Sequence, residues 1–412
     1  MSQYPYAAFS GYGIEIEHMI VDAETLDVKP IADELLKSAG GGYDIEVERG
    51  AANWSNELAL HVIEMKTAGI VTDFAAAART FREQVDDMNA RLVPLGARLL
   101  PGGMHPWMNP DREMRLWPHE NDVIYRTFDR IFDCRGHGWA NLQSVHINLP
   151  FQDDAEFERV HAAARVILPL IPALCASSPF VEGARAPELD HRIAVYRHNA
   201  RRVPSVSGSV IPERVFSRAS YERDLLERIY DDLRPLDPEE TLLEEWVNAR
   251  GAIARFDRGA VEIRLIDTQE CPEQDLAVVA LVTAVVRALA EERFAPLADL
   301  KKPSEHELLA VLVPLIERGS AGVVDDRAFL SLFGLDEPLR ARDLWQKLAL
   351  RTLAADDPAW PGLRVIFEHG TLAERLVAAT ESNVARPSAE ALKHTYARLA
   401  DALRTGHPFV AR

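Results

Sequence analysis

Two glutamates stand two residues apart near the start of the chain, within the alternating stretch GIEIEHMIVD. Alternation combined with β-branched side chains predicts a strand over residues 13–22. Successive side chains of a strand point to opposite faces, so Glu15 and Glu17 share one face. Ile14 and Ile16 point the other way, towards a core. Neighbouring like charges repel each other unless a cation offsets them. The pair therefore indicates either a solvent-facing strand or a Mg²⁺ site, because Mg²⁺ prefers oxygen ligands.

A further carboxylate closes an apolar row in the segment NELALHVIEMKT, which predicts a strand over residues 56–67. Within such a strand Glu64 shares its face with Leu60 and Val62. A carboxylate in this position lies either at the mouth of a sheet or inside a site. The same period of two places Glu57 on the opposite face, so we exclude it from the expected acidic cluster.

A histidine occupies the short stretch SVHINL, which predicts a strand over residues 144–149. His146 and Asn148 share one face of this strand. A histidine on a half-buried strand is either an ordinary core or surface residue or a metal ligand. It is the nitrogen donor that joins carboxylates at a mixed metal site.

A glutamate and an arginine alternate in the segment AVEIRLID, which predicts a strand over residues 260–267. Glu262 and Arg264 share one face, while apolar neighbours occupy the other. One interpretation is a simple ion pair. The other is that Glu262 binds a metal and Arg264 holds a phosphate group, for which its planar guanidinium is suited.

The four predicted strands share one property, because each presents polar residues to one side and apolar residues to the other. The simplest common scaffold is a single sheet with a polar concave face and helices on its back. Residues 176–212, rich in Ser, Pro, Gly and Arg, are expected to form a long functional loop. This loop is our candidate for a lid or a substrate wall.

Helical patterns fill most of the remaining chain. Thr72 is expected to cap a helix over 73–91. A helix over 154–175 should be interrupted by Pro169 and Pro172. Further helices are expected over 273–293, 304–318, 338–354, 371–383 and 388–405.

The composition narrows the function classes. The 412 residues carry a net charge of −18, which argues against a nucleic-acid or anionic-membrane surface. The three cysteines form no CxxC pair, so we do not expect a disulfide framework. The simplest interpretation is that the protein works in a reducing compartment. With no signal peptide or membrane-length apolar stretch, we expect a cytoplasmic protein.

Familiar phosphate-binding and hydrolytic motifs are missing from the sequence. It contains no GxxxxGK[ST] loop, no GxGxxG after a strand, no HExxH and no GxSxG. If ATP binds, metal ions and arginines must therefore replace a phosphate-binding loop.

Six segments, in order, resemble one known family. GIEIEHMIVD resembles its GxExE opening strand, and NELALHVIEMKT its E-x₆-E segment. GGMHPW is similar to its GTHPF turn, QSVHIN to its QHVHVG strand and CASSPFVEG to its SASSPxxxG loop. AVEIRLIDTQECP resembles its Glu-x-Arg strand. Over about residues 11–295 the chain thus resembles the glutamate–cysteine ligase type 2 group of carboxylate–amine ligases, and more distantly the glutamine synthetases.

This resemblance implies an α+β fold with a curved, mostly antiparallel sheet. Residues 1–300 would form the catalytic domain, and 301–412 a helical region packed on it. Ser144 departs from the family, which has a histidine-like residue at that position. The implied ligands of Mg²⁺, or of Mn²⁺ in its place, are Glu15, Glu17, Glu64, His146 and Glu262. The resemblance implies nucleotide contacts for Arg264, Asn148 and Gln143. It implies substrate contacts for Arg192, Arg185 and Arg197. It implies catalytic roles for Arg264 and Glu262.

The implied reaction joins a carboxylate, the γ-carboxylate of glutamate by resemblance, to an amine with ATP as substrate. It passes through an acyl phosphate and releases ADP and phosphate. The alternatives are a metal-dependent amide hydrolase and a non-catalytic nucleotide-binding relative. The expected partners are small molecules rather than nucleic acid or membrane, and the apolar C-terminal helices could supply a homo-oligomer interface.

Overall fold

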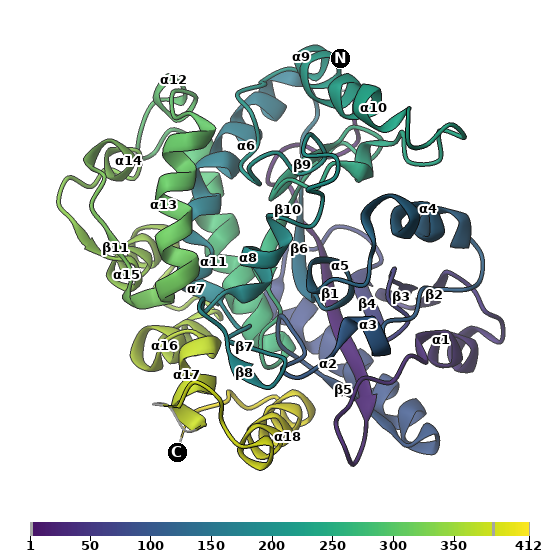
Figure 1. Cartoon of the computed structure of the whole chain (residues 1–412). Coiled ribbons are helices and arrows are strands. Elements are labelled where there is room, and N and C mark those ends of the chain that lie inside the picture. Colours follow the sequence, from purple (N-terminus) through teal and green to yellow (C-terminus); the bar gives the residue numbers. More distant parts are fainter. Residues whose placement is uncertain (1–2, 381–383, 412) are drawn as a thin grey trace.

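A large antiparallel sheet forms the centre of the computed structural model, which describes residues 3–380 and 384–411 (Figure 1). Its strands follow the order β2–β3–β4–β1–β6–β10–β9, and β5 pairs with the far half of β1. The expected α+β class with a mostly antiparallel sheet is therefore confirmed. The strands are β1 (Gly13–Asp22), β2 (Glu46–Arg49), β3 (Ala52–Asn56), β4 (Val62–Thr67), β5 (Ala97–Leu100), β6 (Ser144–Pro150), β9 (Ala252–Arg255) and β10 (Ala260–Asp267).

The register of the sheet brings distant polar residues together. Strand β1 lies between β4 and β6, so that Glu17 is opposite Glu64 and Glu15 is opposite His146. Strand β10 pairs with the other edge of β6 and adds Glu262 to the same region. The side chains at 15, 17, 64, 146 and 262 therefore come from four adjacent strands, as the strand periods predicted.

Three long helices cover the apolar face of the sheet. They are α2 (Phe74–Leu92), α6 (Asp154–Ile167) and α11 (Pro272–Ala290). Helix α11 packs against both α2 and α6, and nearly all of its side chains are buried. The apolar positions of β1, Ile14 and Ile16, are fully buried on this side. Burial of one face fixes the strand register, because a slip of one residue would turn the apolar side chains outwards.

Helix α2 is capped by Asp73 rather than by Thr72, so that prediction was wrong. Residue 73 has an extended backbone, and its carboxylate accepts a 2.9 Å hydrogen bond from the Ala76 amide. Thr72 lies one residue too early for the same contact. A carboxylate at the N-cap also meets the positive end of the helix dipole.

Asp73→Ala is expected to lower the free energy of unfolding by about 1 kcal/mol, because it leaves first-turn amides without their acceptor. Thr72→Ala is the matched control and should change stability by a few tenths of a kcal/mol at most. Urea denaturation followed by circular dichroism measures both. Equal losses in the two variants would contradict the assignment of the cap.

The strand expected over 56–67 is broken. Strand β3 ends at Asn56, β4 begins at Val62, and the two form an antiparallel pair with Ser55 opposite Glu64. Residues 57–61 are the turn between them. Glu57 therefore does not belong to the strand that carries Glu64, and a strand period cannot predict its direction.

The middle of the chain is more ordered than the sequence suggested. The helix expected over 154–175 is interrupted as predicted, by a 3₁₀ turn at Leu168–Leu170 before α7 (Pro172–Cys175). The expected loop 176–212 contains the hairpin β7–β8 (Phe180–Val181 and Ala184–Arg185) and the helix α8 (His191–Tyr196). The remaining short helices before residue 300 are α1 (Ala32–Gly40), α3 (Pro110–Glu113), α4 (Asp122–Phe132), α5 (His137–Ala140), α9 (Arg218–Tyr221), α10 (Glu227–Leu233) and α12 (Leu297–Leu300).

The C-terminal region is helical, as expected, and shares its core with the sheet and its helices. Buried side chains of α13, α15 and α16 belong to the same apolar cluster as the sheet, while α17 and α18 pack with Met19 and Leu100. The division into 1–300 and 301–412 stays a prediction, and the end of the helix expected over 371–383 lies outside the described residues. The elements are α13 (Glu305–Arg318), α14 (Arg327–Ser331), α15 (Ala341–Thr352), α16 (Trp360–His369), α17 (Leu372–Ala379), α18 (Ala389–Thr405) and the hairpin β11–β12 (Val323–Val324 and Leu339–Arg340).

None of the described helices has the length and apolarity needed to cross a membrane.

Candidate active site

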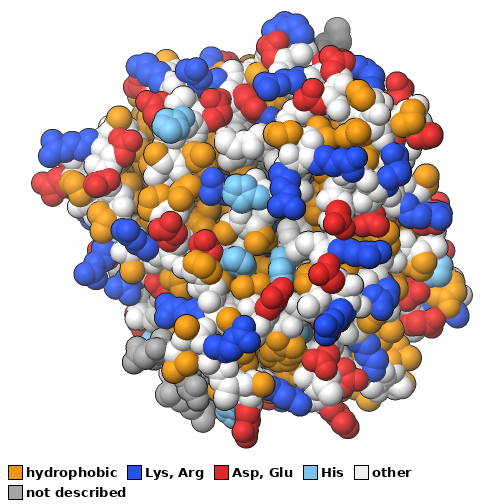
Figure 2. Space-filling view, in the orientation of Figure 1, with side chains coloured by type: hydrophobic (Ala, Val, Ile, Leu, Met, Phe, Trp, Pro, Cys, Tyr) orange, Lys and Arg blue, Asp and Glu red, His pale blue; other side chains and the backbone are white. Residues whose placement is uncertain are grey.

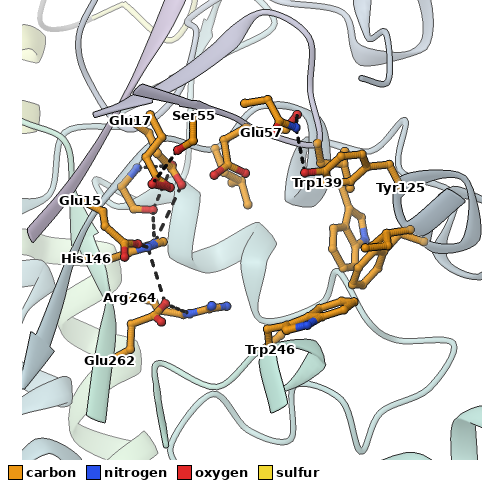
Figure 3. A pocket seen from close by; sticks show the side chains of 18 of the residues that line it. Glu15, Glu17, Ser55, Glu57, Tyr125, Trp139, His146, Trp246, Glu262 and Arg264 are labelled. Carbon is orange, nitrogen blue, oxygen red and sulfur yellow. Dashed lines mark hydrogen bonds and ion pairs between the residues drawn. The ribbon is translucent and has the colours of Figure 1, made fainter. Parts of the chain in front are cut away.

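A cavity of about 530 Å³ opens over the polar face of the sheet (Figure 3). Strands β1, β4, β6 and β10 supply its acidic side. The predicted residues that line it are Glu15, Glu17, Glu64, His146, Arg192, Glu262 and Arg264. The geometric expectation, that four distant stretches converge on one face of one sheet, is therefore met.

The tightest group within this cavity consists of Glu15, His146 and Glu262. One ligand atom of each lies within 4.8 Å of the others. His146 Nδ1 is 3.1 Å from Glu15 Oε2 and 3.7 Å from Glu262 Oε1. Three convergent oxygen and nitrogen donors on rigid strands are what a divalent cation requires.

The charges of this group support one another. Burial alone would raise the pKa of Glu15, but the hydrogen bond and charge of His146, with help from Arg258 and Arg264, lower it to about 2. Burial would lower the pKa of His146, but Glu15, Glu17 and Glu262 outweigh burial and raise it. Glu15 and His146 therefore each favour the charged form of the other.

Ser144 orients two residues of the cavity. Its amide and hydroxyl donate to Glu17 Oε2 at 2.7 and 3.1 Å, and its Oγ lies 2.9 Å from His146 Nε2. Ser144 stands where the family resemblance leads one to expect a histidine-like residue. A small hydroxyl here positions both neighbours without adding a second imidazole beside the acidic group.

Glu57 also lines the cavity, so its exclusion was wrong. The turn after β3 directs it towards Glu64, whose Oε1 accepts a 3.1 Å hydrogen bond from Ser55. Burial, reinforced by the charge of Glu17, raises the pKa of Glu57 to about 8. Burial, Glu15 and Glu57 likewise raise the pKa of Glu64 well above its ordinary value. The signal that could have found Glu57 is the E-x₆-E spacing itself, which matches the family although no strand period explains it.

The ion pair considered for Glu262 and Arg264 is present, with Arg264 Nε 2.6 Å from Glu262 Oε1. Arg255 approaches the other carboxylate oxygen at 3.5 Å. Burial would lower the pKa of Arg264, but Glu262 raises it above its ordinary value. The pair does not exclude the second interpretation, because Arg264 still lines the cavity and can meet a phosphate there.

Of the two amides predicted to contact nucleotide, only Asn148 lies near the cavity. Its Nδ2 donates to Glu15 Oε1 at 3.0 Å, and it lines an adjoining cleft. Gln143 is fully buried, and neither atom of its side-chain amide has a hydrogen-bond partner among the described residues. It does not line the cavity, because it lies in the chain before β6, where its backbone amide binds the Gly103 carbonyl.

Only one of the three arginines predicted for substrate lines the cavity. Arg192 is buried and ion-paired with Asp267, which also accepts hydrogen bonds from the Ser177 amide at 2.8 Å and the Ser178 hydroxyl at 2.9 Å. Arg185 is exposed on β8, outside the cavity lining. Arg185 and Arg197 therefore lie outside the lining of this cavity, and their contact with substrate stays a prediction.

Arg197, the third of these arginines, lines a separate cavity of about 450 Å³ with His137 and His191. Residue 197 still has a helical backbone at the end of α8, and five residues of helix separate it from residue 192 by about 140° around the axis, so the two side chains face different ways. The face of the molecule drawn in Figure 2 carries histidines near its middle, with acidic and basic side chains interspersed around them.

Four aromatic side chains form the opposite side of the main cavity, and we name them the aromatic wall: Tyr125, Phe128, Trp139 and Trp246. They come from α4, α5 and the 3₁₀ turn at Glu245–Val247. Gly138 allows α5 to pack closely, because a Cβ there would lie 2.9 Å from the Asn199 Cβ. Sequence reasoning missed the wall, since its members share no strand or motif.

Residues 12–397 match the model of glutamate-cysteine ligase family 2 (GCS2). The chain belongs to this family. It is accordingly an enzyme of the carboxylate–amine ligase class, and the resemblance inferred from the six segments is confirmed.

Two relatives each match about the same share of this chain. An uncharacterized protein of Archaeoglobus fulgidus is 39% identical over 280 residues, which cover 68% of this chain and 75% of that one. The "Putative glutamate--cysteine ligase 2" of Cupriavidus metallidurans is 26% identical over 294 residues, 70% of each chain.

Two solved structures share the fold. One is the glutamate–cysteine ligase of Francisella tularensis in complex with AMP, with a TM-score of 0.57, 11% identity and coverage of 98% of this chain and 90% of that one. The other is a bifunctional glutathione synthetase of Pasteurella multocida, with a TM-score of 0.56, 14% identity and coverage of 97% and 52%.

The cavity of this GCS2 chain suits divalent cations. Its donors are mainly carboxylate oxygens, the hard ligands that Mg²⁺ and Mn²⁺ prefer, together with one imidazole. Glu57 and Glu64 have raised pKa values because burial and neighbouring carboxylates disfavour their charged forms. A bound cation would favour the charged forms of both carboxylates, so these residues suit a metal site.

Proposed function

We propose that this enzyme joins the γ-carboxylate of glutamate to an amine, driven by cleavage of ATP to ADP and phosphate. One observation carries the proposal: in a GCS2 chain, Glu15, His146 and Glu262 bring ligand atoms within 4.8 Å of one another. Arg264 lies beside them in the same cavity. The names of the relatives support glutamate as the acid.

The cavity would bind Mg²⁺, or Mn²⁺ in its place, through its acidic side. Bound there, the cation would offset charge on the transferring phosphoryl group. The residues that would hold it are Glu15, Glu17, Glu57, Glu64, His146 and Glu262.

The protein's own cations orient the reactants. Arg264, fixed by Glu262, is suited to the γ-phosphate, and Arg192, fixed by Asp267, to the substrate carboxylate. A carboxylate oxygen attacks the γ-phosphorus and the bond to ADP breaks, giving an acyl phosphate. The amine nitrogen then attacks the acyl carbon, phosphate leaves, and the nitrogen loses a proton. Holding both substrates in one cavity supplies much of the acceleration.

The test is ADP release from ATP with glutamate, with and without hydroxylamine as the trapping amine. The proposal expects ADP and γ-glutamyl hydroxamate in equal amounts, and neither without glutamate. Amide cleavage without nucleotide would instead identify a hydrolase. Absence of both reactions would identify an inert nucleotide-binding relative.

ATP together with Mg²⁺ is expected to raise the melting temperature by a few degrees, because a ligand at about 100 times its Kd adds about 2.7 kcal/mol to stability. Removing the metal with EDTA should abolish the shift. Differential scanning fluorimetry measures it, and Glu15→Gln is the matched variant, expected to lose most of it. A shift that is unchanged by EDTA would contradict metal-dependent nucleotide binding.

A further inference from the structure

The aromatic wall leaves ring surface open to the main cavity. Tyr125, Trp139 and Trp246 are only partly buried, and they face the carboxylate side across the cavity (Figure 3). Large apolar side chains gathered in a concave site and not covered by protein are typical of a ligand surface. The acidic side alone therefore does not account for the shape of this pocket.

The rings of the wall pack against one another, and two of its polar groups are bonded to protein. The Phe128 ring centroid lies 5.2 Å from that of Trp139 and 5.9 Å from that of Trp246. The Trp139 indole N–H donates to the Asn199 carbonyl at 3.0 Å. The Tyr125 hydroxyl accepts from Asn56 Nδ2 at 2.9 Å. The wall thus offers mostly ring surface to the cavity, which suits a flat or bulky apolar group.

A cleft beside the main cavity offers the nucleotide a place away from the wall. This cleft, of about 390 Å³, shares Glu15, Glu46, Lys66 and Arg258 with the main cavity. Arg258 Nη1 lies 3.8 Å from Glu15 Oε1, so a cation borders the acidic group on this side. Phosphates seek such cations, and none of the wall residues lines this cleft. The carboxylate of the acid substrate is proposed to bind Arg192. Of the three reactants, only the amine then has no other binding surface than the wall.

We propose that the aromatic wall binds the carbon skeleton of the amine substrate, and that this amine is aromatic or bulky and apolar rather than a small polar one such as cysteine. The inference rests on the proposed ligase function. The amine nitrogen would approach the acyl phosphate from the wall, forming the C–N bond as the C–O bond to phosphate breaks and giving its proton to solvent. Stacking against rigid rings would hold it in line.

An amine panel tests the substrate class. With glutamate, ATP and Mg²⁺, kcat/KM for phenethylamine is expected to exceed that for ethylamine and for cysteine by about tenfold or more, as a buried aromatic ring contributes on this scale. If ethylamine or cysteine is used equally well while hydroxylamine is consumed, the inference fails and the proposed ligase function stands. If not even hydroxylamine supports ADP release, both fail.

Variants of the wall locate the effect. Trp246→Leu is expected to raise the KM for phenethylamine about tenfold and to leave the KM for ATP within twofold. Trp246→Phe should restore most of the loss. Trp360→Leu, on α16 and outside the cavity, is the matched control and should change neither constant. A rise in the KM for ATP with no change for the amine would assign the wall to the nucleobase and overturn the inference.

Discussion

Glu262→Gln is expected to reduce ligase turnover by about 10³-fold or more while the protein stays folded. Glu262 is 2% exposed and contacts His146 and Arg264, so it links the metal-ligating group to the guanidinium proposed for phosphate. Glutamine keeps the shape and can still accept a hydrogen bond from Arg264, but it loses the charge that a cation needs. Coupled-assay turnover and circular dichroism together measure the effect.

Two further variants separate charge from folding. Glu262→Asp keeps the charge and withdraws it by one methylene, so its turnover should lie between those of the wild type and Glu262→Gln. Glu239→Gln changes an exposed glutamate, 72% accessible, and should leave activity unchanged. Full turnover in Glu262→Gln would remove β10 from the metal site. Loss of the circular dichroism signal would instead show that the ion pair with Arg264 is needed for folding.

The polar half of the site could be predicted because strand periodicity is local. In β1 and β10, the two-residue period alone decides that Glu15 and Glu17 share a face and that Glu262 and Arg264 do. The helices behind the sheet follow for the same reason, since their apolar stripes must be buried somewhere. The sequence pattern therefore predicted both the sheet and one side of its cavity.

The remainder depends on tertiary geometry. Glu57 is turned into the cavity by a tight connection, and Arg197 ends α8, a helix inside a segment expected to be a loop. Gln143 is polar and near the right strand, yet it is buried behind the cavity. Trp139 and Trp246 come from separate turns and helices that meet only after packing. No local period relates such positions, so only coordinates could place them.

As the pH falls, the His161→Leu variant is expected to lose less stability than the wild type does. The His161 ring is fully buried among Phe157, Phe216 and Tyr221, and neither nitrogen has a hydrogen-bond partner among the described residues. Burial, assisted by the charge of Arg165, lowers its pKa to about 3. The unfolded chain has an ordinary histidine pKa of about 6.5, so between these values the unfolded state binds the extra proton. Stability from His161 is thus complete above about pH 6.5 and is lost as the pH falls towards 3.

The difference between variant and wild type isolates this effect, because every other titrating group is common to both. As the pH falls from 8 to 5, the wild type is expected to lose about 2 kcal/mol of unfolding free energy relative to His161→Leu. The difference grows by about 1.36 kcal/mol for each pH unit below about 6.5. Any packing loss from the substitution is independent of pH and cancels in this slope. His306→Leu is the control, because residue 306 is exposed on α13 and solvated in both states. Parallel stability curves for wild type and His161→Leu, measured by urea denaturation across this range, would mean that the buried imidazole finds a proton or a partner that its apolar surroundings do not provide.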